Sequence, residues 1–260
     1  MLTDTDLFVE SSQSSSPTSF ALVTGASAGI GFELATQLVA SGHGVILVGD
    51  DATQLQATAD VLRAVGDRPR VEVLQADLSR LDEAQRVHDR ANALGDVEIL
   101  VNNAVATWGA TGVSTLDLSA ERVMLQRNVI STVELTQLFV VDMLRRGQGK
   151  ILFTASVPTQ AAPSLVPVCD AAEAFLYSFA TGIRNELADL GITVTVLVPD
   201  LSEYVEGQSI IVERVAAADE LTDIARAGYQ ALIRGEAWSV TPVPARFEPT
   251  SVLAVQAPVG

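Results

Sequence analysis

Short apolar runs alternate along the chain with longer segments in which apolar residues recur at helical spacing. This alternation is typical of βαβ units, whose strands are parallel and whose crossovers are right-handed. The pattern therefore predicts an α/β fold built on one parallel sheet. The strands are expected at Phe20–Thr24, Val45–Val48, Val71–Leu74, Glu98–Asn102, Lys150–Thr154 and Thr193–Val198, with a seventh at Trp238–Val240.

The helical segments lie between these strands, without an internal linker or repeat. A helix after the third strand is expected to open at Ser79, which with Asp82 or Glu83 resembles a capping box. Doubly wound sheets of this length often form one domain, so we expect a single domain over residues 18–260. The other helices are expected at Gly29–Ser41, Ala52–Val65, Ser119–Arg146, Val168–Leu190 and Ala218–Arg234.

The N-terminal segment has a different composition. Residues 1–17 are polar and rich in Ser and acidic residues, and they lack the basic and apolar regions of a signal peptide. We expect them to form a disordered tail. No apolar run is long enough to predict a membrane span. Cys169 is the one cysteine and cannot form an internal disulfide, so a cytoplasmic location is favoured.

The charge balance narrows the range of partners. The formal net charge is −16, which argues against binding to nucleic acid or to an anionic membrane surface. One cysteine and two separated histidines, His43 and His88, do not predict a metal site.

A glycine-rich turn joins the first strand to the first helix. Its glycines allow a tight turn and a close approach of backbone to a pyrophosphate, and the helix then presents free N–H groups to the anion. The alternative is a strand-to-helix turn with no ligand, which the surrounding βαβ pattern disfavours. The residues expected to hold a cofactor here are Thr24, Gly25, Ser27, Gly29, Ile30 and Gly31.

Further motifs follow the turn in order. They are Asp77-Leu78, Asn102-Asn103-Ala104, Asn128, Ile151–Ser156 and Arg184–Leu187 with Thr193–Pro199. Together with the Thr-Gly-x-x-x-Gly-x-Gly turn, these motifs resemble the short-chain dehydrogenase/reductase family, from about Phe20 to Trp238. The resemblance implies a Rossmann-type doubly wound sheet and an NAD(P) cofactor, with Asp77 holding the adenine and Asn128 in the active site.

The family's catalytic pair is replaced. In the family, a Tyr-x-x-x-Lys pair follows the catalytic Ser, here Ser156; the Tyr transfers the proton and the Lys lowers its pKa. The corresponding positions are Cys169 and Glu173. A thiol is too short to take the hydroxyl's place, and a carboxylate one turn away opposes thiolate formation. Loss of such a group typically lowers the rate about 10²–10⁴-fold.

Each replacement has a second interpretation. Cys169 could act as a nucleophile, but no histidine is expected beside it, so a small residue filling a vacated pocket is favoured. Glu173 could accept hydrogen bonds from ribose hydroxyls, or it could be a solvated carboxylate at the pocket rim.

Other departures lie on the same side of the expected site. Val105 replaces a glycine after the fourth strand, Asp200 replaces the glycine of a Pro-Gly pair, and Tyr204 replaces a threonine. The adenine half therefore looks preserved and the nicotinamide half altered.

Asp50 and Asp51 end the second strand, where a carboxylate repels a 2′-phosphate and accepts from ribose hydroxyls, so NAD is preferred over NADP. An Asp that caps the next helix is the alternative, and both roles are compatible.

Three functions remain open from the sequence. In the first, the chain is a nucleotide-binding relative that has lost ordinary hydride transfer and acts as a sensor or partner subunit. Alternatively, it is an NAD(P)-dependent oxidoreductase that works on a carbonyl or alcohol through Ser156, Asn128 and a water molecule. The third is a pure oligomerisation partner of an active paralogue. The family resemblance implies a homodimer or homotetramer formed through the two long helices, or a hetero-oligomer.

Overall fold

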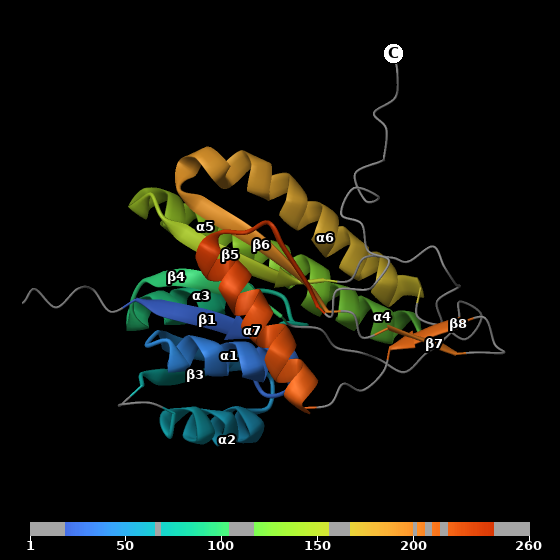
Figure 1. Cartoon of the computed structure of the whole chain (residues 1–260), viewed down its shortest axis with the longest axis horizontal. Coiled ribbons are helices and arrows are strands. Elements are labelled where there is room, and N and C mark those ends of the chain that lie inside the picture. Colours follow the sequence, from blue (N-terminus) through green and yellow to red (C-terminus); the bar gives the residue numbers. More distant parts are fainter. Residues whose placement is uncertain are drawn as a thin grey trace, which may run out of the picture.

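A parallel seven-stranded sheet forms the centre of the computed structural model, which describes residues 19–65, 69–103, 117–155, 167–199, 202–205, 210–213 and 218–241 (Figure 1). The strand order is β3-β2-β1-β4-β5-β6-β9, and every neighbouring pair is parallel. The strands are β1 (Phe20–Thr24), β2 (Gly44–Gly49), β3 (Val71–Gln75), β4 (Val97–Asn102), β5 (Gly149–Thr154), β6 (Ile192–Pro199) and β9 (Trp238–Thr241).

The strand order reverses beside β1, which has β2 on one side and β4 on the other. The chain leaves β1 toward one face of the sheet and β4 toward the other. In an open α/β sheet, a crevice opens at the carboxyl ends of two such strands. The loops that follow β1, β2, β3 and β4 therefore meet at the edge where the glycine-rich turn lies.

Helices cover both faces of the sheet (Figure 1). Buried residues of α1, α2 and α7 pack on one face, and those of α3, α5 and α6 pack on the other. The helices are α1 (Gly29–Ala40), α2 (Ala52–Arg63), α3 (Glu83–Leu94), α4 (Leu118–Leu125), α5 (Ser131–Arg146), α6 (Pro167–Leu187) and α7 (Ala218–Arg234). A π-helical turn, η2 (Gln126–Ile130), joins α4 to α5, and a 3₁₀ turn, η3 (Ala188–Leu190), ends α6.

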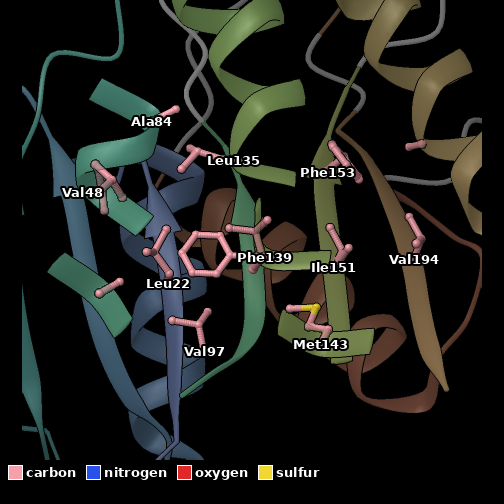
Figure 2. Packing of buried hydrophobic residues seen from close by; sticks show 14 of the residues in the cluster. Leu22, Val48, Ala84, Val97, Leu135, Phe139, Met143, Ile151, Phe153 and Val194 are labelled. Carbon is pink, nitrogen blue, oxygen red and sulfur yellow. The ribbon is translucent and has the colours of Figure 1, made fainter. Parts of the chain in front are cut away.

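Alternate side chains of each strand supply the two cores. In β1, Phe20 and Leu22 face the α3–α5–α6 side, whereas Ala21 and Val23 face the other. Figure 2 shows the first core, with the ring of Phe139 from α5 directed toward Leu22. Because the central strands are buried on both faces, their sequences are continuous apolar runs.

The single-domain α/β fold and its parallel sheet are confirmed. The predicted capping box is wrong: α3 begins at Glu83, after Asp82 in a left-handed conformation with φ 66° and no side-chain cap bond. Ser79 instead donates its hydroxyl to Asp77 (2.6 Å). The expected tail, residues 1–17, lies outside the described residues.

A short antiparallel hairpin is an addition that the sequence did not predict. It consists of β7 (Ser202–Val205) and β8 (Ile210–Glu213) and forms a separate two-stranded sheet. It follows β6 in the chain. In the described part of the chain, no helix is both long and apolar enough to cross a membrane.

Candidate functional site

The glycine-rich turn has the backbone geometry that its sequence demands. Gly25 and Gly29 have φ values of 60° and 59°, in the left-handed region that side chains disfavour. Gly31 is required for a different reason. A Cβ at this position would overlap the Gly25 carbonyl oxygen and the Asn103 amide nitrogen. The turn is therefore closed tightly against the end of β4.

The first turn of α1 is left open to an anion. Ala28 precedes the helix in an extended conformation and makes no side-chain cap bond, and the first turn carries no acidic residue. The first N–H groups of a helix lack partners within the helix, and its dipole favours negative charge there. The Thr58 hydroxyl of α2 donates to the Ser27 carbonyl (3.2 Å) and holds the turn in place. This arrangement suits a phosphate group.

Hydrogen bonds tie the turn to β4. The Asn103 backbone N–H donates to Thr24 Oγ1 (2.8 Å), and the Asn103 side chain donates to the Gly25 carbonyl (3.4 Å). Asn102 is buried and donates to Thr136 of α5 (3.1 Å), while its Oδ1 has no hydrogen-bond partner among the described residues. Thr24 and Gly25 are thus joined to the end of β4 through Asn103, the residue after Asn102. Ala104 and Val105 lie outside the described residues.

An arginine joins two acidic residues, Asp50 after β2 and Asp77 after β3. Arg127 Nη2 lies 2.9 Å from Asp50 Oδ2 and 3.1 Å from Asp77 Oδ1. Burial raises the pKa of Asp77, but bonds from the Ser79 hydroxyl and N–H and from Arg127, with the arginine's charge, outweigh it and lower the pKa overall. Arg127 was not predicted from the sequence, in which its position directly before Asn128 is the signal for it.

Asp51 takes the role of helix cap. Its carboxylate accepts from the backbone N–H groups of Thr53 (2.8 Å) and Gln54 (3.0 Å) at the start of α2. Asp51 therefore takes one of the two roles that the sequence left open at this point, the cap of the next helix.

The π-helical turn η2 presents Arg127 and Asn128 together. The Ser131 N–H reaches the Gln126 carbonyl, five residues earlier, and the Ser131 hydroxyl donates to the Leu78 carbonyl (2.6 Å). Such turns recur at functional sites. Asn128 is buried, and its Oδ1 has no hydrogen-bond partner among the described residues. A buried unpaired oxygen points to a water or a ligand group as its partner.

Cys169 and Glu173 lie near the start of α6. Both are partly exposed and one helical turn apart. Ala172, between them, packs with Met124 and Val129, which brings this part of α6 against the segment that carries Asn128.

Three further expected site positions, besides Ala104 and Val105, lie beyond the described side chains. Ser156 and Asp200 lie outside the described residues, and Tyr204 is placed only as part of β7.

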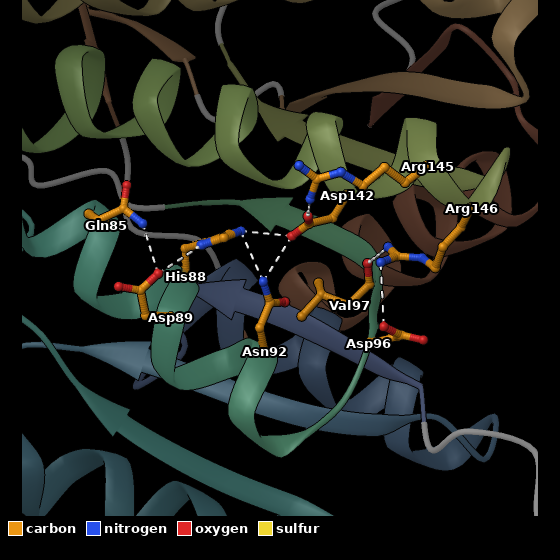
Figure 3. Close-up of polar contacts among 9 residues, drawn as sticks. All are labelled: Gln85, His88, Asp89, Asn92, Asp96, Val97, Asp142, Arg145 and Arg146. Atoms are coloured by element: carbon orange, nitrogen blue, oxygen red, sulfur yellow. Dashed lines mark hydrogen bonds and ion pairs between the residues drawn. The ribbon is translucent and has the colours of Figure 1, made fainter.

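The two histidines belong to other parts of the molecule. His88 Nε2 lies 2.7 Å from Asp142 Oδ2 in a polar cluster between α3 and α5 (Figure 3). His43 lies edge-on to the Tyr229 ring, and burial lowers its pKa, with a smaller opposing effect from Glu98.

The comparisons with known proteins agree with this geometry. The sequence profile of the short chain dehydrogenase family matches residues 19–207. A very-long-chain 3-oxoacyl-CoA reductase of Aspergillus terreus is 32% identical over 179 residues, which are 68% of this chain and 50% of that protein. Nodulation protein G of Rhizobium sp. (strain N33) is 34% identical over 185 residues, which are 70% of this chain and 73% of that protein. The chain thus spans about half the length of the Aspergillus reductase.

Solved structures show the same fold. A short-chain dehydrogenase from Sphingobium yanoikuyae in complex with NADPH has a TM-score of 0.76 at 24% identity, over 93% of this chain and 97% of that one. A bulky-bulky ketone specific alcohol dehydrogenase from Comamonas testosteroni has a TM-score of 0.76 at 22% identity, over 92% and 90% of the chains.

Proposed function

Because the chain belongs to the short-chain dehydrogenase family and has its NAD(P)-binding oxidoreductase fold, we propose that it is a nucleotide-binding member impaired in ordinary hydride transfer. The observation that carries the proposal is the contrast between two halves of one site. The glycines of the phosphate turn have a geometry that suits a pyrophosphate, whereas the count from Ser156 in the sequence assigns Cys169 and Glu173 to the positions of the family's Tyr and Lys.

The impairment follows from proton transfer. A general acid must come within about 2.6–3.2 Å of the substrate oxygen, and a cysteine side chain ends well short of a tyrosine hydroxyl. Glu173, one turn away, adds a negative charge that disfavours a thiolate, whereas a lysine would favour it. In this proposal the protein senses a dinucleotide or serves as a partner subunit.

The proposed cofactor is NAD rather than NADP. Asp50 lies about twenty residues after the glycine-rich turn, where an acidic side chain accepts from the ribose hydroxyls. The same carboxylate repels a 2′-phosphate. The Sphingobium enzyme, by contrast, was solved with NADPH.

Titration calorimetry with NADH, NADPH and ADP-ribose tests the proposal without a substrate. We expect NADH and ADP-ribose to bind, NADH to bind more tightly than NADPH, and turnover of simple carbonyls to be absent. Absence of binding for all three nucleotides, or ordinary turnover of carbonyls by the native chain, would refute it.

Restoring the family's Tyr and Lys tests whether the catalytic pair alone was lost or whether the rest of the site has changed as well. Cys169→Tyr with Glu173→Lys places a phenol and an ammonium at the family's positions. If only the pair is missing, NADH-dependent reduction of a 3-oxoacyl thioester should rise about 10²-fold or more above the native chain. Each single variant is the control, because a phenol without its lysine lacks the cation that lowers its pKa.

A second candidate function is a working reductase that uses Ser156, Asn128 and a water molecule. The buried Asn128 Oδ1, which lacks a partner among the described residues, favours it because that oxygen could hold a catalytic water. Three relatives are named very-long-chain 3-oxoacyl-CoA reductases, and another is named a ketoacyl reductase. Turnover of such a thioester by the native chain, abolished in Asn128→Ala, would support this function over the first.

We also propose that the chain forms a homodimer or homotetramer, or a hetero-oligomer with an active paralogue. Ile130, Val141 and Leu144 are exposed and share one face of the η2–α5 helix, since their spacing is close to whole helical turns. Phe175 of α6 is also exposed, on the same side of the sheet. Apolar side chains gathered on long helices suit a helix-to-helix interface.

A further inference from the structure

The Arg127 guanidinium lies at the ribose end of the proposed nucleotide site. Its partners come from different parts of the chain: Asp50 follows β2, and Asp77 follows β3. One nitrogen, Nη2, serves both carboxylates and so directs both of its hydrogens to them. The arginine is therefore fixed at the carboxyl edge of the sheet.

The guanidinium retains donor capacity. Arginine carries five N–H donors, and Arg127 has no further acceptor among the described residues. Its side chain is 22% exposed, so part of it reaches the surface beside Asp50. Arginine binds phosphate through two parallel hydrogen bonds, which a lysine cannot reproduce.

Asp50 forms an ion pair with Arg127 in the native chain. It is also the residue placed to accept from the ribose hydroxyls, and an arginine near that position accommodates a 2′-phosphate. Asp51 does not compete for Arg127, because its carboxylate caps α2. A single ion pair thus contains both the acceptor for an unmodified ribose and the donor for a phosphorylated one.

We propose that Arg127 is a specificity-determining residue that Asp50 holds away from the ligand. With the pair intact, the site selects an adenosine nucleotide whose ribose is unmodified. Without the Asp50 charge, Arg127 stays tethered by Asp77 and binds a 2′-phosphate. The inference rests on the proposed function, because it requires that a dinucleotide binds at this turn.

The test uses ADP-ribose and its 2′-phosphate. Neither carries a nicotinamide, so their binding does not depend on the proposed altered half of the site. Dissociation constants are measured by calorimetry for the native chain, Asp50→Asn, Arg127→Gln and the double variant. We expect Asp50→Asn to shift the ratio of affinities toward the 2′-phosphate by about tenfold or more, as for a charge-assisted bond. The double variant should lose most of that shift.

Asp60→Asn is the matched control, because it removes one exposed carboxylate from α2, paired with Arg63, and changes the net charge equally. It should leave the ratio unchanged. An equal shift in Asp50→Asn and in the double variant would mean that relief of repulsion alone explains it, and Arg127 would have no such role. No shift in Asp50→Asn also overturns the inference. If the native chain binds neither nucleotide, both the inference and the proposed function fail. This outcome differs from an equal shift in both variants and from no shift in Asp50→Asn, which overturn the inference alone.

Discussion

Gly31 shows how a single residue determines the shape of the site. The position has an ordinary helical backbone, so it is not glycine for conformational freedom; its Cα faces the Gly25 carbonyl and the Asn103 side chain. The contact that excludes a side chain there also brings α1 and β4 together around the space for a pyrophosphate. Packing and ligand binding therefore depend on the same missing Cβ.

Replacing this glycine tests that dependence. Gly31→Ala should lower the free energy of unfolding by about 1–3 kcal/mol, as overpacking does, and should abolish ADP-ribose binding. Gly182→Ala is the control, because Gly182 lies within α6 with open space around it, and alanine there should be neutral or stabilising by up to about 1 kcal/mol. Urea unfolding and calorimetry give both quantities. Tight ADP-ribose binding by Gly31→Ala would contradict the assignment of this turn.

The sequence predicted the residues of the glycine-rich turn because their chemistry is local. Gly25, Gly29 and Gly31 are neighbours in the chain, and their spacing alone specifies a turn before a helix. Arg127 could not be found in the same way, since its partners lie 77 and 50 positions away. Only the folded chain brings Arg127 to Asp50 and Asp77, which follow β2 and β3.

At the scale of elements, a polar cluster joins α3 to α5 on the face away from α1 (Figure 3). Asp142 accepts from Asn92 (2.8 Å), lies 2.7 Å from the His88 ring nitrogen, and pairs with Arg145 (2.8 Å). Burial raises the pKa of Asp142, but the bonds from Asn92 and His88 and the neighbouring positive charges outweigh it, so its pKa lies below the ordinary 3.8. The ring of His88 also packs on Phe139, which connects the cluster to the core.

This cluster should make stability depend on acidity. A carboxyl whose pKa is lower in the folded state stabilises the fold above pH 3.8, and the contribution is lost as the pH falls through the folded value. Asp142→Asn should cost about 1–3 kcal/mol at neutral pH, because bonds to a largely buried carboxylate are lost. The difference from the native chain should narrow as the pH is lowered below 3.8.

Urea unfolding at a series of pH values measures both effects. Asp60→Asn again serves as control, since it removes a similar carboxylate–arginine pair at an exposed site and should change stability by no more than about 1 kcal/mol. An Asp142→Asn deficit that stays constant from neutral to acid pH would show that the carboxylate's charge is not what stabilises the α3–α5 contact.

Element boundaries followed from the sequence where periodicity was strong. The first strand and the last helix match their predicted bounds, Phe20–Thr24 and Ala218–Arg234. The start of α3 does not match its predicted position, because the Ser79 hydroxyl that the capping box needed is hydrogen-bonded to Asp77. The β7–β8 hairpin was missed for another reason, since it pairs only with itself and lies outside the main sheet.

At the scale of the whole molecule, the strand reversal beside β1 places the loops of the expected site at one edge of the sheet. The loops after β1, β2 and β3 carry the glycine-rich turn and the two partners of Arg127, Asp50 and Asp77. The segments after β4, β5 and β6 carry the positions at which the sequence analysis expects departures from the family, Val105, Cys169, Glu173 and Asp200. None of these four residues belongs to the glycine-rich turn or to a strand of the main sheet, so the proposed function keeps the fold while it impairs hydride transfer.

The proposed oligomer has consequences for the whole chain. If α5 and α6 meet a second copy, Val141→Glu with Phe175→Glu would place charges in an apolar interface, which is strongly unfavourable without partners. Sedimentation equilibrium should then give a monomer for this variant and an oligomer for the native chain. Val61→Glu is the control, because Val61 is equally an exposed apolar residue but lies on α2, on the opposite face of the sheet. A native chain that sediments as a monomer, or a double variant that stays associated, would place the interface elsewhere and leave these exposed side chains without a role in assembly.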